Sequence, residues 1–77
     1  MVEFKLEVRL FAYLRENRDK KVYLDIGPGT TVQDVLNILD IDVKDASIIL
    51  INGQDTELSA CFKKGDYLSL FPPVGGG

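Results

Sequence analysis

The sequence predicts an α+β fold in which a mixed sheet of four to five strands carries one main helix on one face. Three observations support this prediction. The chain has 77 residues, which leaves room for one small domain and no second one. Apolar and polar residues alternate in two runs near the N-terminus, as in half-buried strands. A single helical repeat follows, and further strand-like runs come after it.

The N-terminal third is expected to form two strands separated by a short connection. Residues 3–10 place apolar side chains on one face and charged side chains on the other. The apolar ones are Phe4, Leu6, Val8 and Leu10. Residues 11–16 lose the alternation and are expected to form a helical turn, followed by a polar connection over residues 17–20. The alternation returns over residues 21–26 and ends at a turn formed by residues 27–29.

Residues 30–39 are expected to form the helix. Their apolar side chains recur with the spacing i, i+3, i+4 and i+7, which makes one apolar stripe. This stripe consists of Val32, Val35, Leu36 and Leu39. Thr30 with Gln33 can form the N-terminal cap pair. Thr31 with Asp34 is the alternative, and it also places a carboxylate in the first turn, where the helix dipole favours negative charge.

The C-terminal half is expected to contribute two or three short strands. The helical pattern ends at residues 40–42, and a loop follows over residues 43–47. Residues 48–51 predict a short buried strand that ends at the tight Asn52-Gly53 turn. Residues 56–58 are expected to form a brief edge strand.

The last strand, residues 67–71, determines the expected topology. It follows a turn at residues 63–66. If it pairs in parallel with residues 3–10 at the centre of the sheet, the connection through the helix satisfies the right-handed crossover rule. The result is a roll of the β-grasp type. We therefore expect one domain over residues 1–71 and an extended tail over residues 72–77, which leaves from the middle of the sheet.

This tail is the candidate functional segment. Its residues are Pro72, Pro73, Val74, Gly75, Gly76 and Gly77. The prolines cannot continue a strand ladder, so they should leave the domain surface as a stiff spacer. The four residues after them reach about 14 Å when extended, and the glycines have no Cβ atoms to block entry into a partner's narrow active site. The only reactive group at the tip is the α-carboxylate of Gly77, which a partner must activate, for example by adenylation, before sulfide, a thiol or an amine attacks it.

The composition excludes several other kinds of site. One cysteine and no histidine exclude an internal disulfide, a zinc site of the usual kind and a Cys-His or Ser-His-Asp catalytic set. Nine basic and twelve acidic residues are mixed along the chain, so no basic stripe for nucleic acid is expected. We identify no signal peptide and no membrane-spanning run, and expect a soluble, cytoplasmic protein that binds no metal, nucleic acid or membrane.

Several segments resemble those of the MoaD/ThiS group of small sulfur-carrier proteins, which have the ubiquitin-like β-grasp fold. The segments are Phe11-Ala12 followed by Arg15-Glu16, the Thr31-Val32 helix start, the Asn52 turn, Gly65-Asp66, and Phe71 to Gly77. The resemblance covers essentially the whole chain, and the ending is its most specific part. A Phe-Pro-Pro-Val segment, one residue and a terminal Gly-Gly are typical of the MoaD branch, the small subunit of molybdopterin synthase. Gly75 departs from that branch, which often has a larger residue before the final Gly-Gly.

The resemblance implies a carrier without an active site of its own. An E1-like enzyme of the MoeB/ThiF type would adenylate Gly77 with ATP, and a persulfide donor would convert it to a thiocarboxylate. The carrier itself binds no cofactor in this scheme. The tail would then enter a MoaE-like large subunit, in a heterotetramer of two small and two large subunits, and give sulfur to the pterin precursor of molybdopterin.

The candidate site residues follow from the tail and from the resemblance. Gly77 is the reactive end, with Gly76 beside it. The residues expected to contact the partners are Phe11, Phe71, Pro72, Pro73, Val74 and Gly75. For Phe11 and Phe71 the alternative is that they belong to the hydrophobic core. Cys61 can be a resolving or persulfide-bearing thiol, but an incidental small apolar residue is the simpler interpretation.

Three functions would use the tail in different ways. The first is the sulfur carrier, whose acceptor is the pterin precursor or, alternatively, lies in a thiamine thiazole, tungsten-pterin or cysteine pathway. The second is a ubiquitin-like modifier, in which the activated Gly77 forms an isopeptide bond with a lysine amine. The third is an interaction module with an inert tail, for which removal of Gly77 leaves the function intact. The Phe-Pro-Pro-Val segment favours the carrier.

Overall fold

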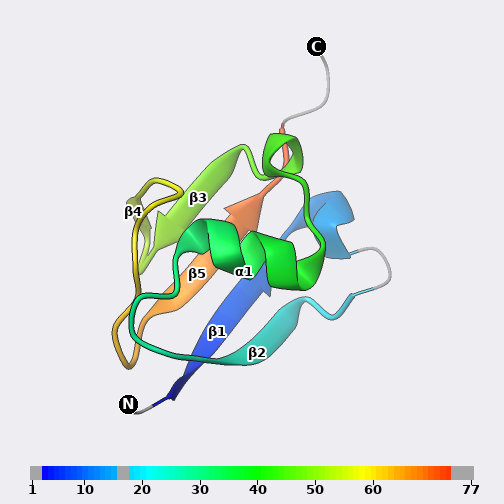
Figure 1. Ribbon diagram of the computed structural model, residues 1–77. Helices are drawn as coiled ribbons and strands as arrows, with labels where there is room; N and C mark the ends of the chain where they lie inside the picture. The colour runs from blue at the N-terminus through cyan, green and yellow to red at the C-terminus, as the bar shows by residue number, and fades with distance from the viewer. Residues whose placement is uncertain (1–2, 16–17, 74–77) are drawn as a thin grey trace.

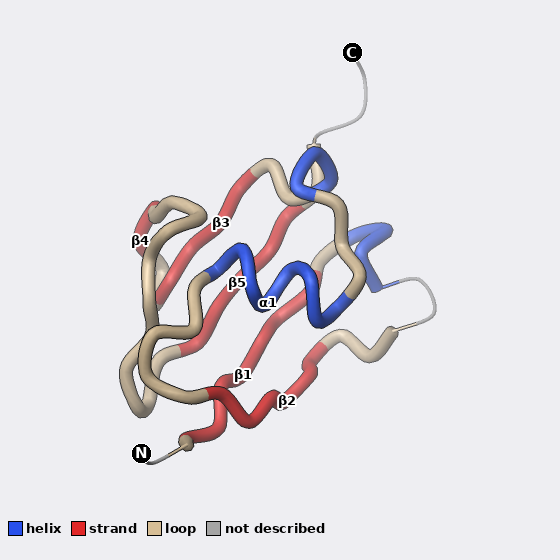
Figure 2. Tube along the Cα trace, in the orientation of Figure 1, coloured by secondary structure: helices blue, strands red, loops and turns tan. Residues whose placement is uncertain are grey.

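The computed structural model describes residues 3–15 and 18–73, and it confirms the α+β prediction. Five strands form one mixed sheet, and helix α1 crosses one of its faces (Figure 1). The elements, with 3-10 turns written η, are β1 (Phe4–Leu10), η1 (Ala12–Arg15), β2 (Lys21–Ile26), α1 (Val32–Leu39), η2 (Val43–Asp45), β3 (Ile48–Ile51), β4 (Gln54–Asp55) and β5 (Tyr67–Phe71). Figure 2 shows that both 3-10 turns lie toward the end of the sheet at which β1 and β5 finish.

The centre of the sheet is the parallel pair that the sequence predicted. The strand order is β2-β1-β5-β3-β4. β1 runs parallel to β5, with Leu10 opposite Leu70, and each has an antiparallel neighbour on its other side. Because β5 is the middle strand, the chain that follows Phe71 starts from a strand supported on both edges.

Helix α1 closes the core on one face of the sheet only. Its cap is Thr31, whose hydroxyl accepts a hydrogen bond from Asp34 N at 3.2 Å, while the Asp34 carboxylate accepts one from Thr31 N at 3.0 Å. The structure therefore selects this cap pair over Thr30 with Gln33. The buried core consists of Leu6, Val8, Leu10, Leu14, Ile26, Val32, Val35, Leu36, Ile41, Ala46, Phe62, Leu68 and Leu70.

Two predictions for the C-terminal half are wrong. The edge strand is Gln54–Asp55 and not residues 56–58, because the two-residue turn at Asn52-Gly53 pairs the residues that follow it immediately. β3 was expected to be buried, but Ile48 is 42% exposed. The reason is that α1 covers one face of the sheet, so alternate residues of β3 point to the uncovered face.

The connection after α1 is more regular than the predicted loop. Residues 43–45 form η2, and the Asp42 carboxylate caps this turn by accepting a backbone hydrogen bond at 3.0 Å. Arg18 reaches the start of the same connection, where its guanidinium donates to the carbonyl oxygens of Leu39 and Asp40 at 3.4 and 3.3 Å. A cation at this position donates hydrogen bonds to free carbonyl oxygens at the helix C-terminus and is attracted by the partial negative charge of that end of the helix dipole.

Two segments noted in the sequence form one hydrogen-bond network. Asn52 starts the β3–β4 turn in the left-handed conformation, with a φ of 54°. Its side-chain amide donates to the Asp66 carboxylate at 2.8 Å, and its side-chain oxygen accepts from Tyr67 N at 3.0 Å. Asp66 also accepts from Lys63 N at 2.7 Å. The Asn52 turn and the Gly65-Asp66 segment therefore have a structural role, because they join the hairpin to the turn before β5.

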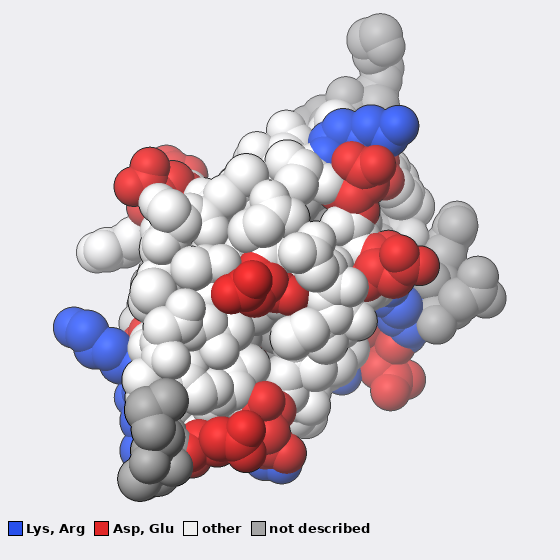
Figure 3. Space-filling model, in the orientation of Figure 1, with Lys and Arg blue, Asp and Glu red and all other residues white. Residues whose placement is uncertain are grey.

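The helix-bearing face has acidic groups in its middle and along its margins, with Lys and Arg toward its edges (Figure 3). No continuous band of Lys and Arg is visible on this face among the described residues. Within residues 3–15 and 18–73, no helix is long and apolar enough to cross a membrane.

Candidate functional site

Phe11 and Phe71 lie side by side on the open face of the sheet, the face that α1 does not cover. Phe11 directly follows β1 and Phe71 ends β5, and the parallel pairing of these strands brings the two residues together. Their rings stack with centroids 4.2 Å apart and planes 9° apart. A hydrogen bond from Phe11 N to Leu70 O, at 3.2 Å, extends the pairing to this point. Both side chains are half-buried and neither belongs to the core cluster, so the interpretation that placed them in the core is wrong.

The stack forms part of a shallow, mainly apolar pocket of about 380 Å³. The pocket is lined by Phe11, Ala12, Tyr13, Ile48, Phe71, Pro72 and Pro73. Tyr13 is 46% exposed and Ile48 is 42% exposed, although both side chains are large and mainly apolar. Exposed apolar side chains gathered around a concave surface are typical of a protein-binding site. We call these seven lining residues the docking surface.

The two prolines contribute to the docking surface in different ways. Pro72 is buried, because the chain stays packed against the domain for one residue beyond β5. The expectation that both prolines leave the domain surface is therefore wrong for Pro72. Pro73 is exposed and is the last residue that the structure describes. Val74, Gly75, Gly76 and Gly77 lie outside the described residues, so the roles predicted for them stay predictions. The docking surface nevertheless lies where the predicted tail begins.

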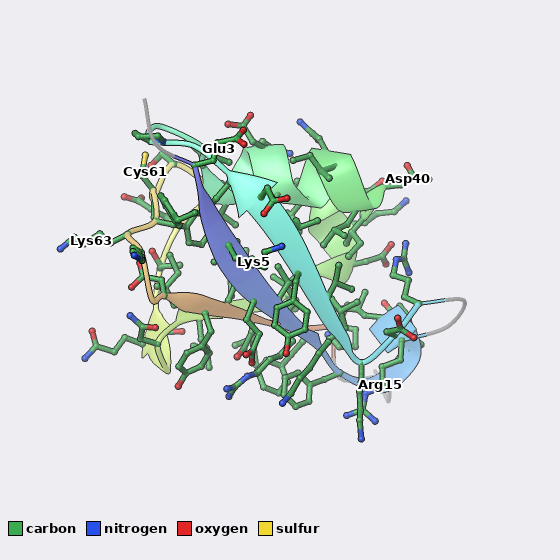
Figure 4. The ribbon with its side chains drawn as sticks, turned by 90° about the horizontal axis from the view of Figure 1, so that it is seen from below. Glu3, Lys5, Arg15, Asp40, Cys61 and Lys63 are labelled. Carbon is green, nitrogen blue, oxygen red and sulfur yellow. The ribbon has the colours of Figure 1, made fainter. Side chains whose placement is uncertain are left out.

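Arg15 contacts Phe11 from the 3-10 turn that follows β1. Its Nε donates to Leu10 O at 2.9 Å, and its guanidinium carbon lies 5.6 Å from the centre of the Phe11 ring. A guanidinium at this distance from an aromatic face is attracted by the ring electrons. Figure 4 shows Arg15 on the side of the sheet away from α1, with Asp40 on the helix side. Arg15 thus helps to orient Phe11 within the docking surface.

Tyr13 connects the docking surface to η2. Its hydroxyl donates to the Asp45 carboxylate at 3.1 Å. Partial desolvation, together with this hydrogen bond and the Asp45 charge, raises the pKa of Tyr13 above its ordinary value of 10.0. Desolvation disfavours the charged phenolate, which would also lose the hydrogen bond and be repelled by the carboxylate. The Tyr13 side chain in the docking surface is therefore neutral at physiological pH.

The open face away from the docking surface carries charges that are paired with each other. Arg9 pairs with Glu7, and its guanidinium lies 4.0 Å from the centre of the Tyr67 ring. The hydrogen bond between these two side chains lowers the pKa of Glu7 and raises the pKa of Arg9. Lys5 and Asp25 form a second pair at 3.2 Å. The docking surface is therefore bordered by a polar region in which opposite charges balance.

Cys61 lies apart from the docking surface. It is exposed and forms an isolated antiparallel bridge with Thr31, at the start of α1. Figure 4 shows Cys61 and Arg15 toward opposite ends of the molecule. This placement gives no support to a role for Cys61 as a thiol that serves the tail.

Sequence reasoning named Phe11 and Phe71 but missed Tyr13 and Ile48. Ile48 lies opposite Phe71 in the β3–β5 ladder, which is why it joins the docking surface. Only the strand register reveals this, because an isoleucine at the start of an apolar run has the same sequence signature as a core residue. Tyr13 gave a weaker signal, as an aromatic residue in the turn directly after Phe11.

The chain matches a known family over nearly its whole length. A family model described as the ThiS family aligns with residues 8–77. The chain belongs to the ThiS family. This ThiS-family protein is therefore a member of the MoaD/ThiS sulfur carriers and small ubiquitin-like modifiers, which confirms the resemblance to the MoaD/ThiS group. Its sheet and helix are those of the ubiquitin-like β-grasp fold.

Three similar proteins indicate the range of this family. Small archaeal modifier protein 3 of Haloferax volcanii is 31% identical, and the alignment covers 95% of this chain and 99% of that protein. The crystal structure of small archaeal modifier protein 1 from the same organism has a TM-score of 0.79 at 31% identity, covering 92% of this chain and 99% of the other. A complex of subunits 1 and 2 of molybdopterin-converting factor from Helicobacter pylori has a chain with a TM-score of 0.65 at 26% identity, covering 96% of this chain and all of that one.

Proposed function

We propose that this ThiS-family protein carries sulfur as a thiocarboxylate on Gly77 and donates it to a pterin precursor, as the small subunit of molybdopterin synthase. The observation that carries the proposal is the position of the docking surface. The Phe11–Phe71 stack and Pro73 line one pocket. Pro73 lies four residues before Gly77, whose α-carboxylate is the only reactive group at the tip of the tail. A partner that binds there has the end of the chain within reach of its own active site, about 14 Å away.

The chemistry acts on the α-carboxylate of Gly77 and needs two partners. In an E1-like enzyme of the MoeB/ThiF type, this carboxylate attacks the α-phosphorus of ATP, which releases pyrophosphate and leaves an acyl adenylate. A persulfide then attacks the carbonyl carbon and displaces AMP, giving an acyl disulfide. A thiol then attacks the donor's own sulfur atom in this S–S bond and forms a new disulfide with it, which releases the thiocarboxylate. Because this chain has no histidine, we assign the general acids and bases to the partners.

The docking surface suits a partner that anchors apolar side chains near its active-site entrance. Aromatic rings with few rotatable bonds lose little conformational entropy on binding, and they are common among the residues that dominate interface energies. The pocket of about 380 Å³ has room for an apolar side chain of the partner. The complex described for the H. pylori proteins supports a MoaE-like large subunit as that partner. We extend this to a heterotetramer of two small and two large subunits.

The second candidate function is a protein modifier, and one observation favours it. The Haloferax relatives, at 31% identity, bear the name small archaeal modifier protein, whereas the H. pylori chain is 26% identical. A modifier would use the same adenylate on Gly77, but a lysine amine would attack it and form an isopeptide bond. The acceptor, and not the carrier, distinguishes the two functions.

Reconstitution with a preformed thiocarboxylate tests the acceptor directly. The thiocarboxylate is installed on Gly77 chemically, and the protein is mixed with a MoaE-like large subunit from the same host and the pterin precursor. We expect formation of the dithiolene and return of the carboxylate form, with no product from the unmodified protein. Absence of the dithiolene, with lysine conjugates formed in a host extract supplemented with ATP, would instead assign the modifier function.

A further inference from the structure

The outer edge of β2 is an unpaired strand edge. β2 is the first strand in the sheet order and pairs only with β1 among the described strands. In the described part of the chain, the backbone of residues 21–26 makes no hydrogen bond beyond that pairing. Figure 4 looks at the sheet from this side, and no described helix or strand lies in front of β2. Such an edge is a template for another strand unless its side chains prevent pairing.

The backbone pattern identifies which groups of β2 point outward. Leu10 N donates to Lys20 O at 2.8 Å, and these residues lie opposite each other if the β1–β2 register is continued by one residue. Hydrogen-bonded and non-hydrogen-bonded pairs alternate along an antiparallel ladder. Val22 and Leu24 therefore use their N–H and C=O groups toward β1. The outward-pointing groups belong to Lys21, Tyr23 and Asp25.

The same three residues form a pattern that is complementary to itself. The strand reads Lys-Val-Tyr-Leu-Asp over residues 21–25. Against an antiparallel copy centred on Tyr23, each lysine lies opposite an aspartate, each valine opposite a leucine, and the tyrosines opposite each other. Lysine at a strand edge usually opposes pairing, but in this register it meets an opposite charge.

We propose that the β2 edge is an interface between two copies of this chain, related by a two-fold axis through Tyr23. Lys21, Tyr23 and Asp25 each form a pair with the second copy in which both N–H···O bonds are exchanged, which gives about six hydrogen bonds between the chains. The partner is a second copy of this chain, because Lys21 and Asp25 lie opposite each other when the strand pairs with an antiparallel copy of itself. The inference holds whether or not the tail carries sulfur.

The side chains on both faces of the sheet support this register. Tyr23 is 55% exposed on the open face and would be covered by its counterpart. Val22 and Leu24 are half-buried against the core on the helix face and would extend that apolar contact across the axis. Asp25 already pairs with Lys5 at 3.2 Å, so Lys21 of the second copy would add a second cation to the same carboxylate.

The arrangement leaves the docking surface accessible in both copies. β2 is at one edge of the sheet, while Phe71 ends the middle strand β5. Because the two β2 strands run antiparallel, the β5 strands also run in opposite directions, and the two tails begin at opposite ends of the paired sheets. Each copy can therefore engage its own partner. The paired segment is short, so the association belongs to the weak, transient class of interfaces below about 1,200 Å².

Sedimentation of the full chain from about 10 µM to about 1 mM tests the proposal over the range suited to a weak interface. We expect a reversible monomer–dimer equilibrium. Lys21→Asp places like charges opposite each other and lowers the association constant tenfold or more. The double variant Lys21→Asp/Asp25→Lys restores it, because the swapped strand is again complementary to itself. Lys20→Asp makes the same change of charge outside β2 and leaves the association within about twofold of the original.

Amide hydrogen exchange at two concentrations gives a readout at single residues. Protection of the amides of Lys21, Tyr23 and Asp25 increases as the dimer forms, while that of Val22 and Leu24 is already high in the monomer and stays unchanged. A chain that remains monomeric at the highest concentration overturns the proposal. So does a dimer that tolerates Lys21→Asp without loss of affinity, or one in which Tyr23 exchanges equally fast at both concentrations.

Discussion

The ring of Phe11 lies 4.2 Å from the ring of Phe71, and this contact joins the ends of the two central parallel strands. The strand pairing that builds the core therefore also builds the docking surface. Any change in the register between β1 and β5 would separate the two rings. Pro72 and Pro73 directly follow Phe71, so the described start of the predicted tail lies at this same surface.

Replacing Phe11 with alanine should weaken both the fold and the binding of a partner. The side chain is half-buried, so we expect a loss of about 1–2 kcal/mol in the free energy of unfolding. As an anchor of the docking surface, its removal should lower affinity for the large subunit tenfold or more. Calorimetric titration with that subunit measures the second effect. A double-mutant cycle with Phe71→Leu should give a coupling of about 0.5–1.5 kcal/mol from the stacked rings.

Ile48 and Ile38 offer a matched pair of exposed isoleucines. Ile48 lines the docking surface and is 42% exposed, whereas Ile38 is on α1 and is 58% exposed. We expect Ile48→Glu to reduce both adenylation of Gly77 by the E1-like enzyme and binding to the large subunit by tenfold or more. Ile38→Glu should leave both within about twofold. Equal effects of the two variants would show that binding does not depend on the docking surface.

The network of Asn52 and Asp66 should contribute to stability without affecting sulfur transfer. Asn52→Ala removes two side-chain hydrogen bonds at a position with a φ of 54°, and should cost about 1–2 kcal/mol in chemical denaturation. Asp66→Ala should cost a similar amount, and the double variant should cost less than the sum. Thiocarboxylate formation on Gly77, measured below the unfolding temperature, should stay unchanged. A selective loss of that activity in either variant would contradict a purely structural role.

The Glu7–Arg9 pair predicts one pH-dependent contribution to stability. Arg9 lowers the pKa of Glu7 below its ordinary value of 4.5, so the ionised form is favoured in the folded state. The stabilisation is present above pH 4.5 and is lost as the pH falls through the lowered pKa of the folded state. Thermal unfolding should therefore show Glu7→Gln less stable than the original at neutral pH, with the difference shrinking in acid. A difference independent of pH would mean that the pair contributes through packing alone.

Local patterns predicted most of the fold. Strict alternation identified β1 and β2, the helical stripe identified α1, and both prolines correctly marked the end of β5. The errors occurred where pairing partners decide the outcome. The strand expected at residues 56–58 lies two residues earlier because the turn dictates which residues pair. Ile48 was expected to be buried because a run of apolar residues does not show which face the helix covers.

Only part of the candidate site could be predicted from the sequence, again because the site depends on which strands pair. Phe11 and Phe71 were predicted as partner contacts, but they are 60 positions apart and their stacking depends on the parallel register. Arg18 was not singled out, since its contacts with Leu39 and Asp40 connect segments that are 21 and 22 residues apart. Long-range contacts of single side chains leave no periodic signal in the sequence.

The intact mass of the protein after incubation with an E1-like enzyme, ATP and a sulfur donor tests the central claim most directly. We predict a fraction heavier by the exchange of one oxygen for one sulfur, located by fragmentation to the Gly77 peptide and absent when Gly77 is deleted. A carboxylate that remains unchanged under these conditions, with an enzyme shown to be active on another carrier, would contradict the assignment of Gly77 as the site that carries sulfur.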